Sequence, residues 1–224
     1  MRLATLAASL SAATIMIGLA AISAIYGARE LSAARMDPGE GPFAMYFWSG
    51  QTAPVSSGNR QQRRLLSSCL SLLAAPEFAF HVSDVRVHLS ASCAMQARHA
   101  ELMGARLAEI PAILAVEEIE AGNPGAVMAL LAQSRAMAPT DLEMILHRLR
   151  IAFRADTAEH LSRPGGILEA ELPVLIGSGR GIQTAVSLYV QLPDIRPLVD
   201  RLADDLPPVD RERFLGVLRR QLRG

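Results

Sequence analysis

Hydrophobic residues from Arg60 to the C-terminus recur at spacings of three and four, the spacing of the buried face of an amphipathic helix. This part of the chain lacks the strict apolar–polar alternation of a half-buried strand. Short proline and glycine interruptions divide the pattern into segments. The pattern predicts helices over residues 60–75, 84–109, 111–121, 124–138, 140–154, 167–176, 181–192, 194–205 and 209–222.

Short connections between amphipathic helices favour antiparallel neighbours. We therefore expect residues 60–224 to form an all-α domain of stacked antiparallel helical hairpins, either a solenoid or an irregular bundle. The helix over 140–154 is expected to begin at a capping box formed by Thr140 and Glu143.

The N-terminal segment has a different character, since residues 3–26 are almost continuously apolar or small and uncharged. A helix of this length spans roughly 36 Å, enough to cross a hydrocarbon core of about 30 Å. The alternative is a cleaved signal peptide, but its best cut, after Ala24, has Ile22 where a small residue is preferred. We expect residues 1–36 to be an uncleaved transmembrane anchor helix and its extension, ended by Asp37-Pro38.

The orientation of this signal-anchor rests on few charges. Arg2 flanks one side of the span, and Arg29 and Arg35 flank the other, so the positive-inside comparison is nearly balanced. Long C-terminal domains are translocated largely regardless of such small differences. We therefore expect a single-pass protein of the bacterial inner membrane with its C-terminal domain in the periplasm.

Residues 37–59 are rich in proline, glycine and serine and show no period, which is typical of a linker. Four aromatic residues nonetheless lie close together in it: Phe43, Tyr46, Phe47 and Trp48. Either these rings rest at the lipid headgroups or on the helical domain, or they dock a partner subunit, because exposed aromatic anchors carry much of the binding energy of interfaces.

Composition narrows the function classes. The 224 residues include 22 basic and 22 acidic residues, and this balance argues against a nucleic-acid partner. Half of the residues are hydrophobic, too many for a disordered chain. Aromatic residues make up only 4%, and the abundance of Ala and Leu favours helices over a sheet.

The chain contains two cysteines, Cys69 and Cys93, on the expected buried stripes of the first two helices. If these helices form an antiparallel hairpin, the two residues lie within about one turn of each other. A disulfide is then geometrically possible in an oxidising periplasm and would stabilise the fold by roughly 3 kcal/mol. Two buried free thiols are the alternative.

No histidine or cysteine spacing of a metal site occurs, although the chain has five histidines. The only glycine-rich turn runs from Gly177 through Gly179 and Arg180 to Gly181, and Ile182 occupies a position where the dinucleotide fingerprint needs Gly or Ala. We expect a flexible turn, and the alternative is an anion site at a helix N-terminus.

Two charged clusters, one acidic at 117–120 and one basic on the last helix, are expected to be solvated faces. In the acidic cluster, neighbouring helix positions point about 100° apart, so the carboxylates cannot flank one glycosidic bond. The second lies on the last helix, which suits capping of the stack or contact with a partner. The clusters are Glu117, Glu118 and Glu120, and Arg211, Arg213, Arg219, Arg220 and Arg223.

Pro139, Pro173 and Pro207 are 34 residues apart, the period of tetratricopeptide repeats. Residues 108–141 partly resemble that repeat. Leu114-Ala115 stands in place of Leu-Gly, the Gly-Asn-Pro turn at 122–124 separates the two helices, and Leu131, Ser134 and Pro139 fall at later marker positions. Pro111 and Glu118 depart from the usual Trp and Tyr. The resemblance implies a degenerate tetratricopeptide-like solenoid.

A looser resemblance covers more of the chain. The segments 65–76, 89–97 and 134–153, following a membrane anchor, look like those of small helical-repeat proteins of alphaproteobacteria. These proteins are associated with envelope and exopolysaccharide assembly. The resemblance brings no catalytic residues with it.

The sequence holds no nucleophile constellation, metal-ligand spacing or cofactor loop, so we expect neither an enzyme nor a cofactor. We expect a membrane-anchored periplasmic scaffold or adaptor with protein partners in an envelope assembly, such as exopolysaccharide biosynthesis or export. One alternative is a ligand-binding or enzymatic module that uses the 177–181 turn as an anion site. Another is a structural subunit of a secretion or division complex.

Overall fold

The computed structural model describes residues 20, 23–24, 59–156, 161 and 165–223. Within these residues every regular element is helical and no strand occurs, so the all-α prediction is confirmed. The predicted anchor (3–26) and linker (37–59) lie outside the described residues, apart from Ala20, Ser23, Ala24 and Asn59. Among the helices of the described ranges, none has the length and apolarity to cross a bilayer.

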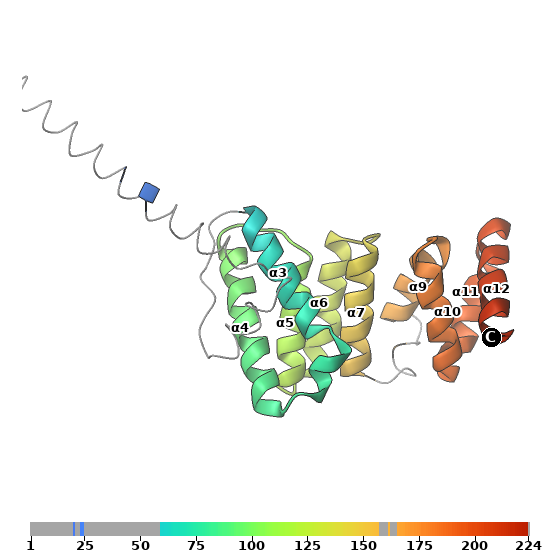
Figure 1. The fold of residues 1–224 in the computed structure, drawn as a ribbon, viewed down its shortest axis with the longest axis horizontal. Coiled ribbons are helices and arrows are strands. Elements are labelled where there is room, and N and C mark those ends of the chain that lie inside the picture. The colour runs from blue at the N-terminus through green and yellow to red at the C-terminus, as the bar shows by residue number, and fades with distance from the viewer. Residues whose placement is uncertain (1–19, 21–22, 25–58, 157–160, 162–164, 224) are drawn as a thin grey trace, which may run out of the picture.

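The described helices stand side by side in an elongated stack, with α4 at one end and α12 at the other (Figure 1). In chain order the elements are α3 (Asn59–Leu73), η1 (Pro76–Phe80), α4 (Ser83–Leu102), α5 (Glu109–Glu120), α6 (Pro124–Met137), α7 (Leu142–Ala155), α9 (Ile167–Gly177), α10 (Gly181–Gln191), η2 (Pro193–Ile195), α11 (Arg196–Asp204) and α12 (Pro208–Arg223).

Helix contacts divide the stack into two rows. In the first row α3 packs on α5, α5 on α7, α7 on α9 and α9 on α11. In the second row α4 packs against α3 and α5, α6 against α5 and α7, and α10 against α9 and α12. One continuous apolar core runs between the rows from Leu66 in α3 to Leu218 in α12. Each helix therefore buries apolar surface mainly against its neighbours along the stack.

The second helix is shorter than the sequence predicts, because α4 ends at Leu102 rather than at residue 109. Gly104 has φ +86°, the left-handed conformation that closes a helix, and the Ala105 N–H donates back to the Ala100 carbonyl at 2.9 Å. Met103 is consequently 59% exposed, although it falls within the predicted helix over 84–109.

The first turn of α7 is capped by a different residue from the predicted one. Asp141 is the N-cap, and its carboxylate accepts from the N–H groups of Glu143 at 3.0 Å and Met144 at 3.2 Å. The predicted capping box of Thr140 and Glu143 is therefore wrong by one residue. Asp and Thr are both good caps, so adjacent candidates in the sequence leave the start ambiguous by one position.

The three prolines spaced 34 residues apart do not occupy equivalent positions relative to the helices. Pro139 follows α6 and Pro207 follows α11, whereas Pro173 lies inside α9. Residues 108–141, in contrast, coincide with the hairpin of α5 and α6.

A buried ion pair connects the middle of the stack to its C-terminal part. The side chains of Arg148 in α7 and Glu171 in α9 are both 0% exposed. Arg148 Nε donates to Glu171 Oε1 at 2.6 Å, and Nη2 donates to Oε2 at 3.2 Å and to the Ala138 carbonyl at 3.2 Å. Arg135 in α6 adds a donation to the Ala170 carbonyl at 3.4 Å. The network thus joins α6 and α7 to α9.

A second network joins helix ends in the N-terminal part of the stack. The nearly buried Glu120 carboxylate accepts from Arg86 Nε at 3.0 Å and from Arg154 Nη2 at 2.6 Å. Arg154 Nη1 also donates to the Leu73 carbonyl at 2.6 Å, and its guanidinium lies 4.8 Å from the centre of the Phe78 ring. One carboxylate therefore holds together the ends of α3, α4, α5 and α7.

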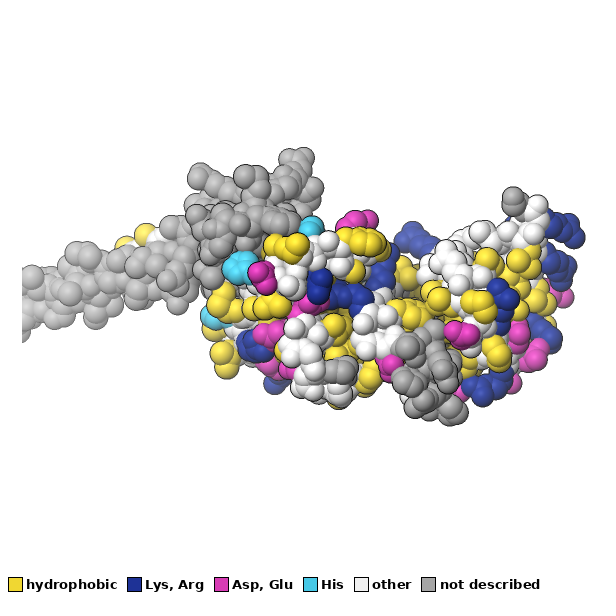
Figure 2. Space-filling view, turned by 90° about the horizontal axis from the view of Figure 1, so that it is seen from below, with side chains coloured by type: hydrophobic (Ala, Val, Ile, Leu, Met, Phe, Trp, Pro, Cys, Tyr) yellow, Lys and Arg dark blue, Asp and Glu magenta, His cyan; other side chains and the backbone are white. Residues whose placement is uncertain are grey.

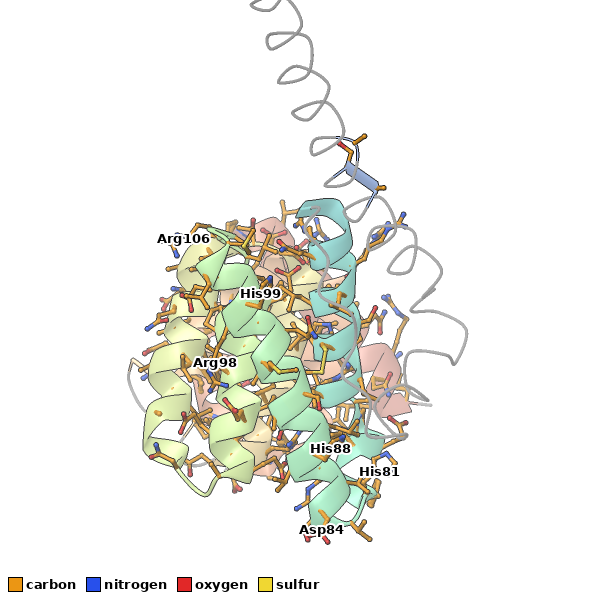
Figure 3. The ribbon with its side chains drawn as sticks, turned by 90° about the vertical axis from the view of Figure 1, so that its left-hand side faces the viewer. His81, Asp84, His88, Arg98, His99 and Arg106 are labelled. Atoms are coloured by element: carbon orange, nitrogen blue, oxygen red, sulfur yellow. A yellow bond between two sulfur atoms is a disulfide. The ribbon has the colours of Figure 1, made fainter. Side chains whose placement is uncertain are left out.

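Cys69 in α3 and Cys93 in α4 form a disulfide, with their Cα atoms 5.7 Å apart (Figure 3). Both residues are fully buried, on the stripes where the helical pattern places them. The bond closes the antiparallel hairpin of α3 and α4, and both cysteines of the chain are used in it.

We expect Glu171→Ala to lower the free energy of unfolding by about 3–5 kcal/mol, because it leaves the Arg148 guanidinium buried without its counter-charge. The double variant Arg148→Met/Glu171→Leu should recover most of this loss. Asp204→Ala, which removes an exposed pair with Arg211, should cost less than about 1 kcal/mol. Urea unfolding measures all three, and a double variant as unstable as Glu171→Ala would contradict the expectation.

Candidate functional site

A polar groove of about 710 Å³ opens on the first-row helices α3, α5 and α7. Its walls come from segments that are far apart in the sequence and that the first row brings side by side. The lining side chains are Arg63, Arg64, Ser67, Ser68, Leu70, Glu109, Asp141, Glu143, Met144 and His147. Only two of these residues are apolar, so the groove is suited to polar contacts.

The groove has a positive and a negative side. Arg63 and Arg64 on α3 are exposed, and Arg63 Nε lies 3.8 Å from Oε1 of the buried Glu109 at the start of α5. Asp141 and Glu143 at the start of α7 supply carboxylates on the other side. An extended polypeptide presents donors and acceptors along its length, and this mixture of charges can match both.

His147 lines the groove from the buried side of α7. Its side chain is 8% exposed, Nε2 lies 3.7 Å from Oε1 of the exposed Glu143, and Nδ1 has no hydrogen-bond partner. Burial lowers the pKa of His147 below its usual 6.5, and the neighbouring Glu143 carboxylate opposes this shift only in part. The imidazole is therefore neutral in the folded protein at neutral pH.

The glycine-rich turn, for which the sequence leaves an anion site as the alternative, links α9 to α10. The Gly181 N–H donates to Ser178 Oγ at 2.7 Å, and the Ile182 N–H donates to the Ser178 carbonyl at 3.1 Å. Two amides that an anion would need are thus occupied within the turn. Gly177, Gly179 and Arg180 are exposed, whereas Gly181 is buried against α9.

The described histidines are His81, His88, His99 and His147. His88 and His99 lie far apart along α4 (Figure 3), the His81 ring lies against Phe78, and His147 lines the groove on α7. In the described part of the chain no three His, Cys, Asp or Glu side chains are placed to hold a metal ion. His160 lies outside the described residues.

The acidic cluster at the end of α5 is only partly the solvated face that the sequence predicts. Glu117 pairs with Arg98, and Glu118 accepts from Asn123 Nδ2 at 2.9 Å, both at the surface. Glu120 is instead buried to 8% exposure in the network described above, so the prediction is wrong for this residue. Its partners come from distant helices, and local sequence does not reveal them.

The arginine-rich helix α12 closes the C-terminal end of the stack. Arg211 pairs with Asp204 at 2.6 Å and Arg213 with Asp210 at 3.3 Å. Phe214 is buried in the core, and its ring makes a T-shaped contact with the ring of Tyr189. The exposed side of α12 also carries Arg219, Arg220 and Arg223.

The predicted partner contact formed by Phe43, Tyr46, Phe47 and Trp48 lies outside the described residues. Sequence reasoning missed the groove, because it is built only by packing. The one local signal was the i,i+4 spacing of Glu143 and His147 on one face of a helix.

Comparison with family models, with curated proteins and with solved structures finds no match for this chain.

We expect Gly181→Ala to destabilise the protein by about 1–3 kcal/mol, because the added Cβ would lie 2.8 Å from the Leu175 backbone. Gly179→Ala in the same turn is the control, since nothing lies within 4 Å of its added Cβ. Thermal and urea unfolding measure both variants. Equal stability of the two would show that the turn does not pack Gly181 against α9.

We expect His147 to make the protein less stable in mild acid. Because its folded-state pKa is depressed, the unfolded chain takes up the proton first, and stability falls as the pH drops below about 6.5. His147→Gln should therefore show a smaller loss of unfolding free energy between about pH 7.5 and 5.5 than the parent protein. His88→Gln, at an exposed position, is the control and should keep the parent's pH dependence.

Proposed function

We propose that this chain is a membrane-anchored helical scaffold of the bacterial envelope, and that the groove across α3, α5 and α7 binds an extended segment of a protein partner. The observation that carries the proposal is the groove itself. Sites for small ligands are mostly apolar, with few polar groups. This groove has the opposite balance, since charged and polar side chains from three helices line it.

The anchoring part of the proposal is supported by the sequence, in which residues 3–26 form an uncharged apolar run. The disulfide between Cys69 and Cys93 supports placing the helical domain in an oxidising compartment such as the periplasm. The resemblance of the sequence to envelope-associated helical-repeat proteins supports an assembly role, with exopolysaccharide biosynthesis or export as the first process to examine.

We also propose that the two rows are a degenerate tetratricopeptide-like solenoid. Two observations support this. The best-matching repeat, 108–141, spans the α5–α6 hairpin, and each first-row helix packs on the next. Repeat stacks of this kind present extended surfaces to their partners.

The binding proposal can be tested by placing a photo-crosslinking amino acid at Ser67 in the groove, within the full chain in its native membrane. Gln133, exposed on the second-row helix α6, is the control position. We expect Ser67 to crosslink a discrete protein that Gln133 does not, with mass spectrometry identifying the protein and the crosslinked segment. Identical products from both positions would contradict the proposal.

With that partner purified, Arg63→Glu/Arg64→Glu should weaken binding by at least about tenfold, or ~1.4 kcal/mol, because it reverses the positive side of the groove. The matched control is Arg219→Glu/Arg220→Glu, which makes the same change at two adjacent exposed arginines of α12. Equal weakening by both pairs would indicate a general charge effect rather than a site on α3.

A further inference from the structure

Large exposed apolar side chains are concentrated at one end of the stack. Most of those in the described residues fall within 80–103, and the few elsewhere are on α6 and α12. We call this set the α4 face: Phe80, Val82, Val87, Met95, Leu102 and Met103. Phe80 and Leu102 are 88% and 85% exposed, so these side chains gain nothing from the core beneath them.

The α4 face includes a coherent helical stripe. At 3.6 residues per turn, Val87, Met95 and Leu102 fall within about 80° of one another. Arg98, which pairs with Glu117 of α5, lies between them on the same side. Figure 3 looks onto this end of the molecule, with α4 in front. The opposite side of α4 is buried against α3 and α5, so the helix has apolar residues on both faces. That pattern is typical of a helix covered on both sides.

The two ends of the stack are different. The outer repeat of a helical stack normally presents a polar surface to water. α12 does so, and Figure 2 shows dark-blue basic side chains over that end. At the α4 end the same view shows hydrophobic side chains beside histidines. Among the described residues, large exposed apolar side chains are therefore more numerous at the α4 end than on α12, where only Val209 and Leu222 are of this kind.

We propose that the α4 face is the docking site of this chain's own aromatic segment, residues 43–48, which caps the N-terminal end of the stack. The segment lies outside the described residues and joins α3 at Asn59. It is uncharged and contains Phe43, Tyr46, Phe47 and Trp48. Aromatic rings pack well on methionine sulfur and on an arginine guanidinium, which Met95 and Arg98 offer.

The length of the intervening chain fits this occupant. Ten residues lie between Trp48 and Asn59, so the Cα atoms of these two residues are at most about 40 Å apart. The 20 residues of α4 make a helix of about 30 Å. Because α3 and α4 are antiparallel, the start of α3 lies near the C-terminal end of α4 (Figure 1), so the segment can run along the face from that end.

Trp48 is the only tryptophan of the chain and reports on docking directly. In the full chain reconstituted in lipid nanodiscs, we expect Trp48 to emit at short wavelength and to be protected from acrylamide. Met95→Glu should shift the emission to longer wavelength and raise acrylamide quenching several-fold. Met137→Glu is the matched control, because Met137 on α6 is similarly exposed, and it should leave the emission unchanged.

Two results would overturn the proposal. One is a Trp48 emission wavelength that Met95→Glu leaves unchanged, and the other is strong quenching of Trp48 by brominated lipids in the parent protein. The second outcome would place the ring at the membrane surface instead.

A photo-crosslinking residue at Phe47 gives a test without any change to α4. Crosslinks to peptides from 83–102 within one chain support the proposal. Crosslinks only between two copies, or only to other proteins, contradict it and identify the partner that the segment contacts instead.

Discussion

The continuity of this stack depends on the buried pair of Arg148 and Glu171. Most core contacts join helices that are neighbours in sequence, but this bidentate pair connects α6 and α7 to α9 with both charges removed from water. A buried ion pair adds little net stability over an apolar pair, because desolvation offsets the attraction. We expect it to favour one relative position of α7 and α9, because a register that separates the two side chains would leave a charge buried alone.

The helical content was predictable because the signal is local. The three-to-four spacing predicts the helices, and the apolar stripes of the first two helices predict that Cys69 and Cys93 lie close together in an antiparallel hairpin. Boundaries were less predictable where one residue decides them. Gly104 ended α4 early, and Asp141 rather than Thr140 capped α7. The buried role of Glu120 was beyond sequence reasoning, because its arginine partners come from other helices.

The groove, like the buried position of Glu120, depends on tertiary packing and cannot be recognised from local sequence. Arg63, Glu109 and Glu143 carry no shared motif, and only the stacking of α3, α5 and α7 brings them together. Within the groove Arg64 and Glu143 are exposed to solvent, whereas His147 is buried and stays neutral because burial lowers its pKa. A surface of this kind selects partners by the pattern of charges rather than by shape alone.

The disulfide of the first hairpin has a mechanical consequence. Any pull applied at Asn59 reaches α3 first, and α3 can unwind only as far as Cys69 before the load passes through a covalent bond into α4. α4 is in turn fastened to α3 and α5 along its length and, through Arg86, to Glu120. Tension from the N-terminal side is therefore shared by several helices at once beyond Cys69. Arg63, Arg64, Ser67 and Ser68, which form most of the α3 wall of the groove, lie before Cys69, so a pull would reach this wall before the covalent bond takes the load.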